Sequence, residues 1–92
     1  MKVIFQGENV TINESIGMAD KVRLYNLATK YYVEATRTSL DGDAELTPED
    51  TAAMPVGVYN LEIFTKLNNM TRMVKCIENY AVVKESSLAK KQ

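Results

Sequence analysis

Three carboxylates stand close together in this chain, at Asp41, Asp43 and Glu45. Oxygen ligands of this kind suit Ca²⁺, a hard cation that takes about six to eight of them. The surrounding residues do not complete an EF-hand loop, and Asp41-Gly42 is typical of a tight turn whose neighbours face water. We therefore expect a turn here, with a Ca²⁺ site as the alternative.

A second acidic pair, Glu49 and Asp50, has the residue types of a general acid and base. Adjacent residues on a helical turn point apart, however, and the dipole at a helix start favours carboxylates without any catalytic role. The chain has no histidine, and Cys76 is its single cysteine. No Ser-His or Cys-His dyad and no cage of imidazoles or thiolates can therefore form within it. We expect no enzyme activity, no cofactor and no metal, and we expect Cys76 to be a small buried apolar residue.

Tyrosines at positions 25, 31 and 32 could supply flat faces on which bases or sugars stack. The chain carries 11 Lys and Arg against 12 Asp and Glu, for a formal net charge of −1. That balance lacks the basic footprint of a nucleic-acid-binding domain. We expect Tyr32 to pack across strands or to lie in a protein contact, and a carbohydrate-binding module is the rival interpretation.

The length and composition of the chain fit one folded domain. Its 92 residues are 46% hydrophobic and 25% charged, which is close to the average for globular domains. No apolar run is long enough to span a membrane, and the apolar start at Met1–Phe5 is too short for a signal peptide. We expect a single domain over residues 1–84 and a polar arm over residues 85–92, with neither membrane nor nucleic acid as a partner.

Most of the chain alternates apolar and polar residues between turn signals, which predicts strands. The expected strands cover residues 2–5, 9–12, 58–65, 70–77 and 80–84. Asn68-Asn69 supplies a hairpin turn, and Glu78-Asn79 predicts a bulge. Thr47 as N-cap and Pro48 at the first helical position predict a short helical turn from Pro48 to Met54. Tyr59, Leu61 and Ile63 are expected in the core.

The stretch from Ala19 to Ser39 fits two patterns. Leu24, Leu27, Ala28, Tyr31 and Ala35 follow a helical spacing. Val22 and Leu24 also alternate with polar neighbours, and residues 31–38 are rich in β-branched and aromatic side chains, which lowers helix propensity. We expect two strands, Lys21–Asn26 and Lys30–Ser39, with a helix and an α+β fold as the alternative. About seven short antiparallel strands predict an all-β, two-sheet sandwich, because a single sheet would leave one apolar face in water.

The segment from Leu46 to Ile63, LTPEDTAAMPVGVYNLEI, resembles a pattern in small immunoglobulin-like sandwich domains of phage virion proteins, such as the N-terminal domain of baseplate upper proteins. The resemblance extends over about Leu46 to Val83. It implies that the helical turn caps one end of the sandwich, that Gly57 permits a close reversal and that Tyr59 enters the core. It also implies a structural or host-recognition role in a virion.

We therefore expect an immunoglobulin-like β-sandwich that is a non-enzymatic virion protein, assembled in the host cytoplasm. The favoured role is a capsid auxiliary or decoration protein that binds the assembled shell, with a tail or baseplate component as the alternative. The expected partners are major capsid or tail proteins, and self-association is a further option. The residues expected at the interface are Tyr32, Phe64, Lys84, Lys90 and Lys91.

Overall fold

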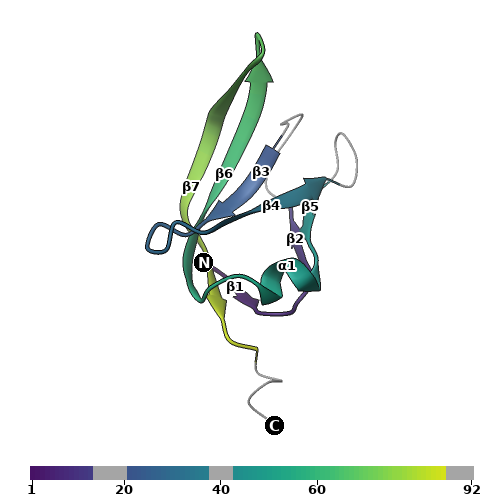
Figure 1. The fold of residues 1–92 in the computed structure, drawn as a ribbon, viewed down its shortest axis with the longest axis vertical. Helices are drawn as coiled ribbons and strands as arrows, with labels where there is room; N and C mark the ends of the chain where they lie inside the picture. Colours follow the sequence, from purple (N-terminus) through teal and green to yellow (C-terminus); the bar gives the residue numbers. More distant parts are fainter. Residues whose placement is uncertain (14–20, 38–42, 87–92) are drawn as a thin grey trace.

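The computed structural model describes residues 1–13, 21–37 and 43–86, which are mostly strand (Figure 1). In chain order the elements are β1 (Lys2–Phe5), β2 (Val10–Ile12), β3 (Lys21–Tyr25), β4 (Tyr32–Arg37), β5 (Ala44–Leu46), α1 (Pro48–Ala52), β6 (Gly57–Leu67) and β7 (Met70–Lys84). The expected all-β class is confirmed. Within the same ranges, no helix is long and apolar enough to cross a membrane.

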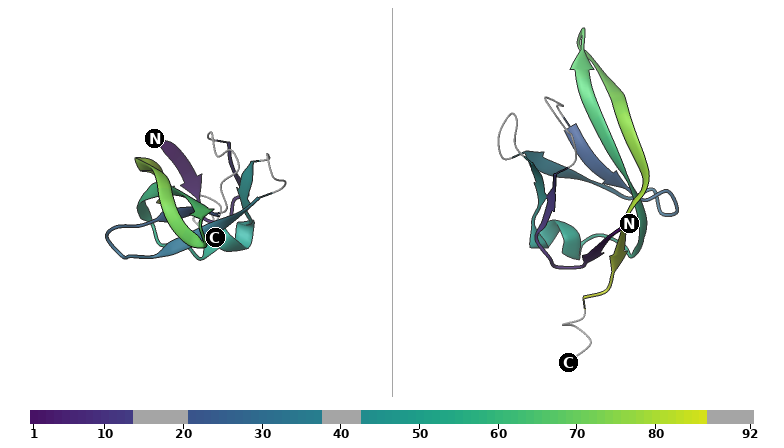
Figure 2. Two further views of the ribbon diagram at one scale, coloured as in Figure 1. Left: turned by 90° about the horizontal axis from the view of Figure 1, so that it is seen from above. Right: turned by 180° about the vertical axis from the view of Figure 1, so that it is seen from behind.

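The strands of these ranges form one mixed sheet of seven, in the order β1-β7-β6-β3-β4-β5-β2. β4 pairs with β3 through its first residues and with β5 through Thr36 and Arg37, so the sheet turns a corner at β4. Figures 1 and 2 show the strands curling around a shared interior until the sheet nearly closes at its two edges, β1 and β2.

The expectation of a purely antiparallel arrangement is wrong for one pair. β1 runs parallel to the end of β7, with Lys2 opposite Ala81 and Phe5 opposite Lys84. A tight turn forces two strands to be antiparallel, but β1 and β7 are joined only through the rest of the chain, so no turn constrains their direction.

The core lies inside the curled sheet. Tyr59 and Leu61 are fully buried and Ile63 nearly so, as expected from their alternation in β6. The other apolar residues of the core are Ile4, Val10, Ile12, Val22, Leu24, Ala44, Leu46, Met54, Ala81 and Val83. Six of the seven strands supply all of these buried residues except Met54, and β4 adds the half-buried Val33 and Ala35, which pack against them. Each strand therefore contributes one face to a single core.

Two strands, and not a helix, form between residues 21 and 37. In β3 the buried Val22 and Leu24 alternate with more exposed residues, and in β4 the half-buried Val33 and Ala35 alternate with exposed ones. Leu27, which the helical pattern would bury, is 66% exposed. Residues 19, 20, 38 and 39 of the expected range lie outside the described part of the chain.

The short helix α1 forms where the capping signals place it. The Thr47 hydroxyl accepts a hydrogen bond from the Asp50 backbone N–H at 3.1 Å, and the Asp50 carboxylate accepts one from the Thr47 N–H at 2.9 Å. Pro48 occupies the first turn, and the helix ends at Ala52, slightly before the expected Met54. The buried Thr51 hydroxyl donates to the Glu8 carbonyl at 2.7 Å and accepts from the Gly7 N–H at 3.0 Å. This short helix therefore fastens the turn between β1 and β2 to the body.

The last two strands are longer than expected, at 11 residues for β6 and 15 for β7. The predicted strands at 70–77 and 80–84 are one continuous strand, because the expected irregularity at Glu78-Asn79 bends the ladder without ending it. There the register shifts opposite Asn60, and the Asn79 N–H donates to the Asn60 side-chain oxygen at 3.0 Å. The short strand β5 was not expected at all.

Candidate functional site

Two of the residues expected at an interface come together on the outer face of the sheet. Tyr32 in β4 and Phe64 in β6 flank β3, and the guanidinium carbon of Arg23 lies 4.8 Å from the centroid of each ring. Tyr25 adds a third ring, at 5.3 Å. A cation over aromatic faces at such distances is attracted to the ring electrons. Arg23 is therefore the centre of an aromatic cluster that draws on three strands.

The strand register explains why these side chains meet. Arg23 lies opposite Glu34 on β4 and opposite Glu62 on β6, and Tyr25 lies opposite Tyr32. Residues opposite one another in an antiparallel pair project to the same side of the sheet. Since Val22 and Leu24 face the core, Arg23 and its cross-strand neighbours must face outward.

An ion pair fixes the centre of the cluster. The Arg23 Nε donates to the Glu62 Oε1 at 2.5 Å, and their side chains are only 27% and 10% exposed. Glu62 alternates with the core residues Leu61 and Ile63 and so faces outward, but neither its burial nor its pairing with Arg23 was predicted. Charge-assisted hydrogen bonds are short and strong, so this pair holds the guanidinium between the rings. We call Arg23, Tyr25, Tyr32, Glu62 and Phe64 the Arg23 face.

The rim of the Arg23 face is charged and exposed to solvent. The Lys21 ammonium lies 3.8 Å from the Glu34 carboxylate, and both side chains are about half exposed, at 53% and 52%. Exposed ion pairs of this kind add little stability. Tyr32 itself is 52% exposed. An aromatic centre with a charged rim matches the general anatomy of protein–protein interfaces.

The remaining expected interface residues lie elsewhere. Lys84 is exposed at the end of β7, beside Phe5 of β1, and does not belong to the Arg23 face. Lys90 and Lys91, and with them most of the expected arm at 85–92, lie outside the described residues.

Cys76 is exposed on β7, so the expectation of a buried cysteine is wrong. It lies opposite Glu62 in the β6–β7 register, on the outer face of the sheet. Partial desolvation raises the pKa of the Cys76 thiol, and the nearby carboxylates of Glu62 and Glu78 raise it further. A raised pKa keeps the thiol protonated and lowers its nucleophilicity at neutral pH.

The carboxylates considered for catalysis or Ca²⁺ binding have structural surroundings. Asp50 caps α1, and Glu49 is exposed in its first turn. Asp43 directly precedes β5 and Glu45 is its middle residue. Asp41 lies outside the described residues. In the ranges that can be inspected, no three His, Cys, Asp or Glu side chains gather closely enough to hold a metal ion.

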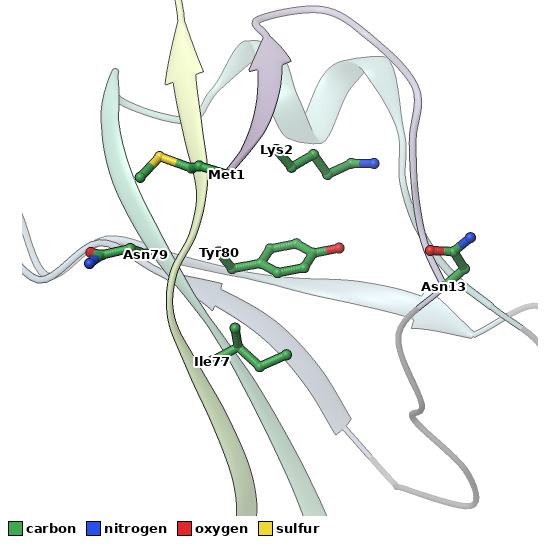
Figure 3. A pocket seen from close by; sticks show the side chains of 6 residues that line it. All are labelled: Met1, Lys2, Asn13, Ile77, Asn79 and Tyr80. Atoms are coloured by element: carbon green, nitrogen blue, oxygen red, sulfur yellow. The ribbon is translucent and has the colours of Figure 1, made fainter.

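Two shallow grooves lie away from the Arg23 face. The first, of about 370 Å³, is lined by Met1, Lys2, Asn13, Ile77, Asn79 and Tyr80. Figure 3 shows Tyr80 and Lys2 pointing from β7 and β1 toward Asn13, across the open seam of the curled sheet. The second, of about 350 Å³, is lined by Asn26, Leu27, Ala28, Val56, Gly57, Val58, Asn60 and Asn79. Neither lining set contains a carboxylate, cysteine or serine that could act as a nucleophile.

The β6–β7 hairpin is a further surface that the sequence did not single out. β3 pairs with β6 only from Asn60 to Phe64, and β1 pairs with β7 only from Ala81 onward. Beyond Phe64, among the residues that the structure describes, the two strands pair only with each other, and Figure 1 shows them projecting from the body. The expected turn at Asn68-Asn69 is confirmed, with positive φ angles of 52° and 65°, as two-residue hairpin turns require. We call residues 65–75 the hairpin tip.

Comparisons of the chain with models of protein families, with curated proteins and with solved structures gave no match. A functional assignment therefore depends on the surfaces described above. Of these, the Arg23 face has the most definite geometry, because an ion pair and three rings hold its members in fixed positions.

Proposed function

We propose that this chain is a non-enzymatic structural protein of a phage virion, a capsid auxiliary or decoration protein that binds the assembled shell through its Arg23 face. A tail or baseplate position is the alternative. The resemblance over Leu46 to Val83 supplies the virion context, and the geometry of the Arg23 face carries the binding role. The partner is the major capsid or tail protein, on particles assembled in the host cytoplasm.

The strand order supports an immunoglobulin-like sandwich. β3, β6 and β7 take the places of strands C, F and G, and β2, β5 and β4 take those of B, E and D. In the proposed sandwich, the passage between the two layers corresponds to the corner at β4, which pairs with β3 and then with β5. The Tyr59 hydroxyl donates to the Pro55 carbonyl at 2.6 Å, as in the tyrosine corner of such domains. Tyr59 stands at the start of β6, where that motif belongs.

The Arg23 face has the properties of an energetic centre of binding. Tyrosine and arginine are enriched among the residues that dominate protein interfaces, because they bury much area with few rotatable bonds. Here the Arg23–Glu62 pair and the cross-strand rings already restrict the side chains in the free protein. Little conformational entropy is then lost on association. Lys84, at the end of β7, and the polar arm expected over residues 85–92 extend the contact.

The proposal is tested by co-sedimentation with particles of the phage whose genome encodes the chain. Wild type is expected to sediment with the particles, and Tyr32→Ala and Phe64→Ala are expected to weaken binding at least tenfold, since hot-spot truncations cost about 2 kcal/mol or more. Leu27→Ala is the matched control, because Leu27 is an apolar residue off this face and is at least as exposed as Tyr32. Circular dichroism checks that each variant is folded.

Three results would overturn the assignment. Wild type that stays in the supernatant has no affinity for the shell. Equal loss of binding in Leu27→Ala and Tyr32→Ala would place the contact elsewhere. Saturable binding of a glycan by the isolated chain, lost in Tyr32→Ala, would make it a carbohydrate-binding module.

A further inference from the structure

In the described part of the chain, no third strand pairs with the hairpin tip. Its described side chains are almost all exposed, including three large apolar ones: Met70, Met73 and Val74. An isolated two-stranded ribbon is at best marginally stable in water, and exposed apolar clusters mark contact sites. Methionine side chains are flexible and adapt to irregular surfaces. The tip therefore presents adaptable apolar side chains that a partner surface could cover.

The charge of the tip is of one sign. Residues 64–77 contain Lys66, Arg72 and Lys75 and no carboxylate. The remainder of the chain holds eight of the 11 cations and all 12 carboxylates, so its formal net charge is −4. Three cations on a negatively charged body are too few for binding nucleic acid, whose phosphates would repel that body. An acidic protein surface fits the tip better.

Such a surface exists on the body of the same molecule. Its carboxylates come from the residue before β5, from β5 itself, from α1 and from the turn that the Thr51 hydroxyl holds against α1: Asp43, Glu45, Glu49, Asp50 and Glu8. Arg37, which pairs with Ala44 of β5, adds one positive charge to these five carboxylates, so their net charge stays negative. Exposed apolar groups, Ala52, Ala53 and Val56, follow in and just after the helix. We call this the β5–α1 face. Figures 1 and 2 show it on the side of the body away from the hairpin tip.

We propose that the chain self-associates head to tail, with the hairpin tip of one copy docked on the β5–α1 face of the next. Lys66, Arg72 and Lys75 approach the carboxylates, and Met70, Met73 and Val74 cover the small apolar groups beyond them. Within one molecule the two surfaces face apart, so they can meet only between copies. A contact between different surfaces is heterologous and produces a ring or an open chain of copies. This inference uses no residue of the Arg23 face and is independent of shell binding.

Sedimentation velocity of the full chain, over a concentration series, tests the proposal. The weight-average sedimentation coefficient is expected to rise with concentration at about 20 mM salt and to fall toward the monomer value at about 500 mM, where exposed charges are screened. Lys66→Glu/Arg72→Glu/Lys75→Glu is expected to weaken association at least tenfold. The control Lys2→Glu/Lys30→Glu/Lys84→Glu makes the same change in net charge elsewhere and is expected to associate like wild type.

A charge-swap pair identifies the receiving surface. Glu8→Lys/Glu45→Lys/Glu49→Lys alone is expected to be monomeric, and mixing it with the tip variant is expected to restore a two-component complex. A wild-type chain that is monomeric throughout overturns the proposal, as does association that survives the tip changes or is lost equally in the control. Binding of the tip to anionic vesicles or DNA without self-association would also overturn it. Tyr32→Ala should leave the sedimentation series unchanged, so failure of this proposal and failure of shell binding are separate results.

Discussion

Tyr59 stabilises the part of the core that lies at the start of β6. Its ring is fully buried, and its hydroxyl donates to the Pro55 carbonyl at 2.6 Å and shares a side-chain hydrogen bond with Asn26. Asn26 is itself only 2% exposed, and its side-chain oxygen accepts the N–H groups of Ala28 and Thr29. The hydrogen bonds of the Tyr59 hydroxyl therefore connect the start of β6 with the loop between β3 and β4.

Tyr59→Phe should destabilise the fold by about 1 kcal/mol, because one hydrogen bond is lost and Asn26 loses a partner. The effect should also depend on pH. Burial raises the pKa of Tyr59 above its ordinary value of 10.0, so the unfolded chain loses its proton at a lower pH than the folded one. The neutral phenol thus contributes stability that is complete below pH 10 and is lost as the pH rises further.

Urea unfolding of both proteins at pH 7 and at several values above pH 10 measures this. The wild type should lose its advantage over Tyr59→Phe as the pH rises, and parallel curves for the two proteins would contradict the assigned role of the hydroxyl. Tyr25→Phe serves as the control, because the Tyr25 ring lies on the outer face beside Arg23 and the bond to Pro55 belongs to Tyr59.

Gly57 shows how a single backbone conformation supports the same corner. Its φ angle is +140°, and a Cβ at this position would lie 3.0 Å from the Asn26 side-chain nitrogen. Only glycine adopts such a conformation at little cost, and it also leaves room for Asn26. The resemblance implied a close reversal at Gly57, but the residue that approaches it could not be found from the sequence, since Asn26 is distant in the chain.

At the scale of single elements, α1 is held by its own ends. With five residues it is too short to be stable through its own hydrogen bonds. Thr47→Ala removes the hydroxyl that accepts the Asp50 N–H, and the expected loss is about 1 kcal/mol of unfolding free energy. Thr47→Ser should retain most of it, whereas Thr11→Ala, at an exposed position in β2, should have little effect. Thermal unfolding compares the three, and a Thr47→Ala protein as stable as wild type would show that packing alone holds α1.

The elements that the sequence predicts well are those with a strong local signal. The alternation in β3 and in β6, the cap at Thr47 and the Asn68-Asn69 turn each determine their structure within a few residues. The short strand β5 was missed because Ala44, Glu45 and Leu46 give only three residues of alternation. Its formation depends on pairing with β2 and β4, which are remote in sequence.

The Arg23 face was predicted only in part for the same reason. Tyr32 and Phe64 could be selected singly as exposed aromatics. Their meeting over Arg23 requires the register of β3 against both β4 and β6. Register is a property of pairs of strands, so no single stretch of sequence encodes it. The burial of Glu62 follows from the same pairing and was not foreseen.

At the scale of the whole molecule, the protein divides into a body with a buried core and the hairpin tip, whose described side chains are mostly exposed. The body has the curled sheet around one core, and the hairpin tip projects from it along the longest axis of the molecule. Local opening is easiest where few apolar contacts cover the backbone hydrogen bonds. The two parts should therefore differ in stability even though β6 and β7 run through both.

Amide hydrogen exchange should resolve this division. In the monomer at about 500 mM salt, amides of Lys66 to Lys75 should exchange at least a hundredfold faster than those of Tyr59, Leu61 and Ile63, whose side chains are buried in the body. At low salt and high concentration the wild-type tip should become protected, because a second copy then covers it, while the tip charge variant should show no such change. Uniform exchange along β6 and β7 in the monomer would mean that the hairpin opens only with the whole domain. Protection of the tip that does not depend on concentration would mean that its cover comes from within its own chain.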